Sequence, residues 1–418
     1  MNGGSRRDKT KISARPHIRP APRRRDPDAA YDAILAETAR RLQTIESAYG
    51  RERTAAAGLV TELLAQPSER RSLLIRNCSR FHTWGLYSRL LEESRALAIQ
   101  NPDLAESLAY LAIELAHHLD PTTYGTPAIE DLRARAWTYI GNAHRLRSDL
   151  AGAEEAFQKA AAHLRRGTRE PIERALFLDL KASLLRAQRR FDSAKQVLRQ
   201  TFDLFLSVGD RHRAGRALIS MEIVHHYEGT EEEGIPLLYQ ALELIDPDQE
   251  PYLVLCVWHN LIDDLAEAGR AMEARGLLRK ARALYRRFPD AWTRNRRNWV
   301  AGKIARGLGQ SAAAEDLFLA ARRGFLEEGI AYGTALVSLD LAALYEVQGR
   351  TAEVKRLAAE TVPVFSSRQI HREAMMALTY WQRAVEAEQG GLELVASLAA
   401  YLRRARYDPS LRFTAPAP

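Results

Sequence analysis

Histidine and carboxylate side chains occur in this chain at spacings that could bring metal ligands together. His259, Asp263 and Asp264 lie about one helical turn apart, which would place two ligands on one face of a helix. The adjacent pairs His117-His118 and His225-His226 point about 100° apart on a helix, so neither pair can chelate one ion. An ion pair or hydrogen bond lining a groove explains the 259–264 spacing more simply. We therefore expect no metal site and no cofactor.

Patterns that carry catalysis are absent from the sequence. It has no glycine-rich phosphate loop, no GxSxG elbow and no HExxH motif. Cys78 and Cys256 stand far apart and outside any CxxC pair, which argues against a zinc site or a disulfide framework. Isolated cysteines are usually small buried hydrophobic residues rather than nucleophiles. The sequence indicates a non-enzymatic protein, with an enzyme that has an unrecognised site as a remaining hypothesis.

The composition is that of a helical protein with a core over most of its length. Hydrophobic residues make up 46% of the 418 residues and charged residues 27%, so only a minor part can be disordered. Two thiols and no signal peptide predict a reducing, cytoplasmic environment. No apolar run approaches the roughly 18–20 residues that a membrane span needs. We expect a soluble cytoplasmic protein without membrane contact.

The net charge of +8 belongs to the first 25 residues. This segment contains nine Lys and Arg residues and one Asp, whereas the rest of the chain has equal numbers of basic and acidic residues. Prolines at positions 16, 20 and 22, with almost nothing to bury, predict a disordered basic tail over 1–25. Its possible partner is a polyanion, contacted without specificity.

Glycines at a constant interval define an internal repeat. Gly229, Gly269, Gly309 and Gly349 are 40 residues apart, and each follows an amphipathic pattern that it would end as a helix C-terminal residue. Small residues recur at fixed offsets after each glycine, including Ala274 with Ala281 and Ala314 with Ala321. Small side chains at such points allow two antiparallel helices to approach closely. The sequence therefore predicts a series of helix hairpins.

One unit carries a recognisable set of packing positions. Its positions are Trp137, Ile140, Gly141, His144, Ala153, Phe157 and Ala160. The tetratricopeptide pattern has Trp, Leu, Gly, Tyr, Ala, Phe and Ala at these offsets, so only the Tyr is replaced. A second unit repeats the scheme with Trp258, Leu261, Leu265, Ala274, Leu278 and Ala281. We expect Trp137 and Trp258 to pack in the core. Trp299, one position further along its helix, is expected on the groove side, where it would either contact a ligand or patch an imperfect core.

The chain thus resembles the tetratricopeptide family over about 84–405. The resemblance implies an all-α fold, an α-solenoid of antiparallel helix hairpins wound as a right-handed superhelix. The period of about 40 residues, against 34 in the family, resembles the sensor domains of bacterial regulators, including peptide-binding quorum-sensing receptors and maltose-regulator-like ATPases. HEAT repeats share the longer period but not the Trp, Gly and Ala offsets.

The repeat divides the chain into consecutive segments. The expected divisions are a tail (1–25), an N-terminal helical segment (26–83), a degenerate repeat (84–126), six repeats (127–371), a capping helix pair (372–405) and a second tail (406–418). Within the N-terminal segment we expect helices at about 28–48, 52–65 and 68–81, with a break near Gly50.

The concave surface of the solenoid is the expected binding groove. Positions that alternate with the packing positions on the first helix of each hairpin should line it. The candidate groove residues are Arg135, Thr138, Asn142, Arg145, Asp179, Ser183, Arg186, Arg216, His226, His259, Asp263, Arg296, Trp299, Lys303 and Arg306. The complete stripe has seven basic and three acidic residues in a neutral body, which suggests an acidic or carboxylate-bearing peptide partner. The abundance of arginine explains this excess equally well.

Two functions fit these features. The first is a scaffold, adaptor or sensor that binds a protein or peptide segment in its groove. The alternative is a nucleic-acid-associated regulator with a basic tail and a repeat-built sensor, although residues 28–81 show no convincing helix-turn-helix. The carboxylate clamp that binds chaperone tails is not implied, because Thr138, Leu180 and Ser220 replace its Lys, second Asn and final Arg.

Deleting residues 1–25 tests the role assigned to the tail. We expect binding to heparin or random DNA to disappear and the melting temperature to stay unchanged, because the tail offers charge but no core. In the full chain this binding should weaken steeply between about 50 and 200 mM salt, as counterion release requires. Sequence-specific DNA binding by the truncated protein would instead favour the regulator.

Overall fold

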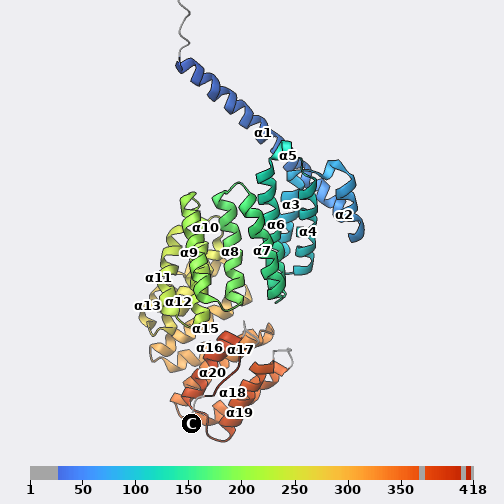
Figure 1. The fold of residues 1–418 in the computed structure, drawn as a ribbon. Helices are drawn as coiled ribbons and strands as arrows, with labels where there is room; N and C mark the ends of the chain where they lie inside the picture. The colour runs from blue at the N-terminus through green and yellow to red at the C-terminus, as the bar shows by residue number, and fades with distance from the viewer. Residues whose placement is uncertain (1–26, 367–371, 406–410, 416–418) are drawn as a thin grey trace, which may run out of the picture.

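The structure, a computed structural model, describes residues 27–366, 372–405 and 411–415; these residues are mostly helical and contain no strand (Figure 1). The tail predicted over 1–25 lies outside the described residues. The first helices are α1 (Pro27–Leu64), α2 (Ser68–Asn77), the 3₁₀ turn η1 (Ser79–Phe81), α3 (Trp84–Leu97), α4 (Pro102–His118) and α5 (Pro121–Tyr124). The middle helices are α6 (Thr126–Leu146), α7 (Leu150–Arg166), α8 (Pro171–Ala187), α9 (Phe191–Ser207), α10 (Arg211–Glu228), α11 (Glu231–Leu244) and α12 (Pro251–Glu267). The last are α13 (Ala271–Lys280), α14 (Arg282–Arg287), α15 (Ala291–Gly307), α16 (Ser311–Glu327), α17 (Ala331–Val347), α18 (Thr351–Ser366), α19 (Arg372–Glu386) and α20 (Leu392–Ala405).

Antiparallel hairpins follow one another from α6 to α18. The pairs are α6 with α7, α8 with α9, α10 with α11, α12 with α13 and α14, α15 with α16, and α17 with α18, and each packs on the next. The predicted all-α solenoid of helix hairpins is confirmed. The pairing of helices also supports the divisions at 84, 127 and 372, which remain a proposal. The C-terminal helices lie at the opposite end of the molecule from α1 (Figure 1).

Helix α1 corrects one expectation from the sequence. It runs through Gly50 without the predicted break and has 38 residues. A glycine inside a helix costs only about 1 kcal/mol, which neighbouring contacts can offset. Glu52 supplies such contacts: its carboxylate accepts hydrogen bonds from the Gly85 backbone N–H (3.0 Å) and the Tyr124 hydroxyl (2.8 Å). These bonds hold α1 against α3 and α5 on the C-terminal side of Gly50.

The glycines of the 40-residue repeat act as predicted. Gly229, Gly269, Gly309 and Gly349 all have positive φ angles, between 69° and 86°. Only glycine adopts this conformation without a steric cost, so each of these residues ends the first helix of a hairpin and turns the chain toward the second.

Close packing inside the hairpins depends on glycines facing aromatic rings. A Cβ atom added at Gly141 would lie 2.9 Å from the Phe157 ring, and one added at Gly302 would lie 2.6 Å from the Phe318 ring. Both rings are buried, at 1% and 0% exposure. The absence of a side chain on one helix therefore makes room for the ring of the next.

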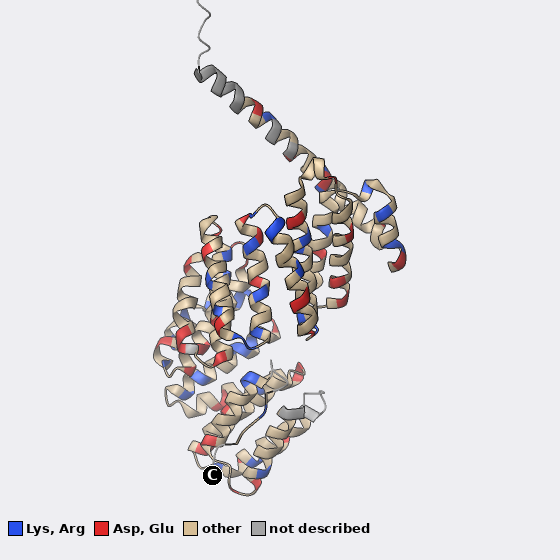
Figure 2. Cartoon of the chain, viewed as in Figure 1, with Lys and Arg blue, Asp and Glu red and all other residues tan. Residues whose placement is uncertain are grey.

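The tryptophans predicted in the core pack against it but are only half-buried. Trp137 is half-buried and contacts two apolar clusters, and the Lys159 ammonium lies 4.5 Å from its ring centre. Trp258 packs against the cluster centred on α12. Basic and acidic residues are interspersed along the described helices (Figure 2). None of the described helices is long and apolar enough to cross a membrane.

Replacing Gly302 by alanine tests the glycine–ring contact. The added methyl group would collide with Phe318, so Gly302→Ala should lower the free energy of unfolding by about 1–3 kcal/mol. Gly276 on α13 is the matched control: a Cβ there meets nothing within 4 Å, and Gly276→Ala should stabilise the protein by about 0.5–1 kcal/mol. Urea unfolding followed by circular dichroism measures both, and equal effects of the two variants would contradict the packing described.

Candidate functional site

The largest described cavity of the groove lies over the first helices of successive hairpins. Its volume is about 590 Å³, and its walls come from α8, α10, α12, α15, α16 and α17, with Arg403 contributed by α20. Seven of the residues predicted to line the groove are together here, namely Arg186, His226, His259, Asp263, Arg296, Trp299 and Lys303. The same cavity is lined by Glu222, Tyr227, Asp264, Glu267 and Tyr332, which are not among the groove positions expected from the sequence.

Buried ion pairs form one side of this cavity. The Lys303 ammonium lies 2.7 Å from Asp263 Oδ1 and 2.7 Å from Glu267 Oε1, and the residue is 4% exposed. Arg403 reaches the same Glu267 carboxylate at 2.8 Å. Two cations and two carboxylates therefore neutralise each other, and the groove wall carries no net charge at this point.

The pKa values of these groups follow from burial opposed by their partners. Burial would raise the pKa of Asp263, but the Lys303 ammonium holds it far below its usual range. The pKa of Glu267 is also lowered, because Lys303 and Arg403 outweigh the effect of burial. Burial would lower the pKa of Lys303, but Asp263 and Glu267 raise it. The ion pairs therefore stabilise the fold fully at neutral pH, and their contribution is lost as the pH falls through the lowered carboxylate values.

The His259 side chain is hydrogen-bonded to another side chain in the interior of the protein. Its Nδ1 atom is hydrogen-bonded to the Tyr285 hydroxyl at 2.7 Å, and the residue is 6% exposed. Burial, followed by the charge of Arg296, holds the pKa of His259 well below its usual value, so the ring is neutral. Since Asp263 contacts Lys303, the ligand pair suggested by the 259–264 spacing does not form.

Trp299 lies in the wall of the cavity and is held by polar and aromatic contacts. Its Nε1 donates to Asp340 Oδ2 at 2.7 Å. Its ring packs edge-on against Phe325 with 5.8 Å between centroids, and the Lys303 ammonium lies 4.5 Å from the ring centre. The indole is therefore fixed in position, with part of its surface left to the cavity.

A second cavity of about 330 Å³ lies further along the groove toward the N-terminus. Three predicted groove residues, Asn142, Asp179 and Arg216, line it, together with Tyr139, Leu176, Phe205 and others from α3 to α10. Burial raises the pKa of Asp179, against the opposing charges of Arg216 and Arg186. Arg216 is paired with Glu250.

The remaining predicted groove residues differ in what they contact. The prediction for Thr138 is wrong. This residue is 2% exposed and its hydroxyl donates to the Ala134 carbonyl at 2.8 Å, so it faces the interior rather than the groove. Ser183 is half-buried. Arg135 is paired with Glu173, and Arg306 with Asp340 at 2.6 Å. These pairs join neighbouring hairpins.

Three groove arginines differ from the others. Within the described part of the chain, no carboxylate forms an ion pair with Arg145, Arg186 or Arg296. Arg145 donates two hydrogen bonds to Asn142 Oδ1, at 3.1 and 2.8 Å. Arg186 lies over the Tyr227 ring at 5.3 Å, and Arg296 donates to Asn260 Oδ1 at 3.3 Å. Burial and then the nearby charge of Arg186 lower the pKa of Arg145 to about 10.

No protein-family model matches the chain, and neither does any curated protein. A solved structure of a Rap protein complexed with competence and sporulation factor is similar, with a TM-score of 0.54 and 14% identity over 77% of this chain and 87% of that one. Aspartyl phosphate phosphatase F from Bacillus subtilis is also similar, with a TM-score of 0.53 and 13% identity over 82% and 89%. Both are helical repeat proteins of the tetratricopeptide kind. This chain has the tetratricopeptide-type fold.

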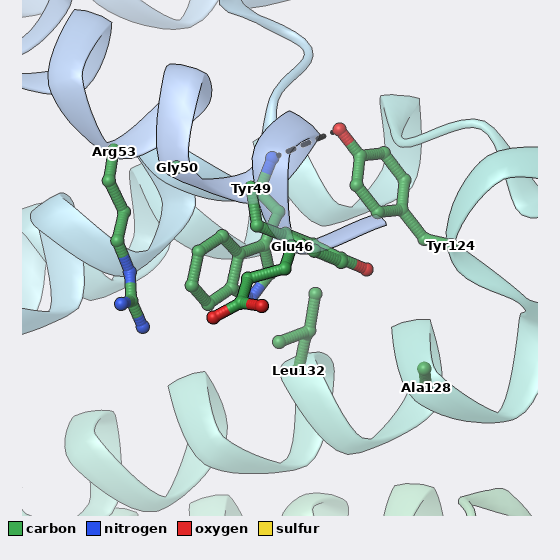
Figure 3. A pocket seen from close by; sticks show the side chains of 8 residues that line it. Glu46, Tyr49, Gly50, Arg53, Tyr124, Ala128 and Leu132 are labelled. Atoms are coloured by element: carbon green, nitrogen blue, oxygen red, sulfur yellow. Dashed lines mark hydrogen bonds between the residues drawn. The ribbon is translucent and has the colours of Figure 1, made fainter. Parts of the chain in front are cut away.

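Another cavity of this protein lies outside the groove, where α1 meets α3, α5 and α6. Its volume is about 520 Å³, and Trp84 provides one aromatic wall. Tyr49 and Tyr124 provide two more (Figure 3). The Trp84 backbone N–H donates to the Tyr124 hydroxyl at 3.3 Å, and Arg53 lies 5.0 Å from the Trp84 ring centre. No sequence pattern indicates this cavity, because its walls come from positions far apart in the chain.

Removing the ammonium of Lys303 tests the buried ion pairs. Lys303→Met leaves Asp263 and Glu267 close together with only Arg403 as a charged partner, so at pH 7 it should cost roughly 3–5 kcal/mol of unfolding free energy. The loss should shrink as the pH falls toward about 4, because the carboxylates of the variant then take up protons. Lys355→Met is the control, since Lys355 pairs with Glu388 on the surface and should contribute less than about 1 kcal/mol. Urea unfolding at both pH values measures these effects; a deficit that does not change with pH would contradict the network.

Proposed function

We propose that this protein is a non-enzymatic adaptor or sensor that binds a peptide or protein segment in its concave groove. Arg145 and Arg186 receive an acidic group of that segment. The similar Rap structure is a complex with competence and sporulation factor, which supports a binding role for a groove of this architecture. The proposal rests chiefly on the arginine pair.

The main support for this proposal is that some basic residues of the groove have carboxylate partners within the described part of the protein and others do not. Arg135, Arg216, Lys303 and Arg306 are neutralised by carboxylates of the protein itself. Arg145 and Arg186 come from successive hairpins, α6 and α8, and are close enough for their charges to repel each other. Holding two guanidinium groups together in a partly buried place is unfavourable until an anion neutralises them. A carboxylate bound by both would form charge-assisted hydrogen bonds of about 1.5–3 kcal/mol each.

The surroundings of the pair suit an extended segment. Asn142, bonded to Arg145, lines the smaller cavity, whereas Arg186 lines the larger one. An acidic side chain at the pair would therefore have a cavity on either side for its neighbours. Tyr227, Trp299 and Phe325 give the larger cavity aromatic surface for an apolar side chain.

The titratable groups of the larger cavity favour binding over catalysis. His259 is bonded to Tyr285, and Asp263 is paired with Lys303. Burial raises the pKa of Cys256, which lies with His259 in the wall of a separate small pocket, so its thiol is protonated at neutral pH. The contacts of His259 and Asp263 oppose their use as a general base, and a protonated thiol is a poor nucleophile.

Neutralising the arginine pair tests the proposal. Panning a random peptide library against the protein should enrich sequences that contain Asp or Glu, or that need their free C-terminal carboxylate. The double variant Arg145→Gln/Arg186→Gln should bind these peptides at least about 100-fold more weakly by fluorescence polarisation, because two charge-assisted contacts are lost. Its melting temperature should not fall, since the variant also removes the repulsion between the two cations.

The matched control is Arg279→Gln/Arg282→Gln, which changes two exposed arginines of α13 and α14 away from the groove. This control should bind the peptides as the unmodified protein does. Enriched peptides without acidic groups, or equal affinity for both double variants, would refute the role assigned to Arg145 and Arg186.

A further inference from the structure

Three potential metal ligands converge in the floor of the larger groove cavity. Glu222 and His226 lie one turn apart on α10, and Asp264 lies on the neighbouring helix α12. One ligand atom from each residue lies within 4.8 Å of the other two. We infer that Glu222, His226 and Asp264 form a binding site for a divalent transition-metal ion such as Zn²⁺.

Burial of the two carboxylates supports a cation at this position. Glu222 is 2% exposed and Asp264 is 4% exposed, so two carboxylates lie close together where water screens them poorly. A divalent ion bound by both would neutralise their negative charge. Asn260 Nδ2 lies 3.4 Å from Glu222 Oε2 and helps to orient this carboxylate, as contacts behind metal ligands do.

The distances allow a metal ion after small side-chain rotations. Zinc binds imidazole nitrogen and carboxylate oxygen at about 2.0–2.2 Å, so ligand atoms around a tetrahedral ion lie roughly 3.3–3.5 Å apart. Separations of up to 4.8 Å exceed that value by roughly 1 Å, a difference that rotation of the side chains would close on metal binding. The imidazole of His226 favours Zn²⁺ or Co²⁺ over Mg²⁺ and Ca²⁺, which prefer oxygen ligands.

The position of the site also gives it a relation to the groove. All three residues line the cavity, and His226 is only half-buried, so a fourth coordination position would face the cavity. Water would fill that position in the free protein, and an oxygen or nitrogen atom of a bound segment could replace it. Metal binding itself does not depend on the proposed peptide function.

Titration of the tag-free, chelator-treated full chain with Zn²⁺ and Co²⁺ tests the site. We expect one equivalent of either ion to bind with saturation and to raise the melting temperature, and bound Co²⁺ to show the visible absorption of low-symmetry coordination. Glu222→Gln, His226→Gln and Asp264→Asn should each weaken Co²⁺ binding by about 10–100-fold or more. Glu228→Gln is the matched control, because this carboxylate is on the same helix but pairs with Lys195.

Further measurements distinguish coordination by these three residues from metal binding elsewhere on the protein. Circular dichroism of the metal-free variants shows whether each is folded, and any one folded variant decides the question. Absence of equimolar binding, or binding that survives all three substitutions, would overturn the assignment. Tighter binding of Mg²⁺ or Ca²⁺ that is indifferent to His226→Gln would also overturn it. The Arg145→Gln/Arg186→Gln variant should keep its metal, so failure of the peptide proposal leaves this result distinguishable.

Discussion

The close approach of the two helices in each hairpin is the constraint on which this structure depends. Where Gly141 faces Phe157, and Gly302 faces Phe318, the ring of one helix occupies the space that a side chain of the other would need. This contact fixes the face of the first helix that turns toward its partner. The opposite face is thereby directed to the concave side, so packing between helices determines which residues a ligand can meet.

Ion pairs join neighbouring hairpins. They also divide the cations of the groove into those neutralised by the protein itself and those left to bind a ligand. Arg135 with Glu173, Lys303 with Asp263, and Arg306 with Asp340 connect positions 34 to 40 residues apart, which is about one repeat. Such pairs link a hairpin to its neighbour and cancel their own charge. Arg145 and Arg186 have no such partner among the described residues, and so the groove keeps positive charge at one place rather than along its length.

Periodicity made the fold predictable from sequence, whereas the site was predictable only in part. The 40-residue glycines and the offsets around Trp137 report local geometry, which the sequence records directly. Thr138 was wrongly assigned to the groove because helical spacing alone does not show whether a residue at the edge of the groove stripe is buried by its neighbours. In the structure its hydroxyl is hydrogen-bonded to its own helix. Gly50 was misread because its cost is small beside the contacts of Glu52. Glu222 and Asp264 could not be paired from the sequence, since they lie on different helices, α10 and α12, and their side chains approach one another only in the folded chain.

The contact between Arg403 and Glu267 changes how such a solenoid should unfold. The two residues are 136 positions apart, whereas a repeat array normally has contacts only between neighbours and can lose its end units one at a time. Here the last helix is tied to the middle of the array through a charge that Lys303 also shares. Fraying of the C-terminal end must therefore break a half-buried ion pair of α12, which favours unfolding of the second half of the array as a cooperative unit. Glu267 and Arg403 both line the larger cavity, so a ligand bound there would contact both partners of this ion pair. Its binding would therefore reduce the mobility of the C-terminal helix α20.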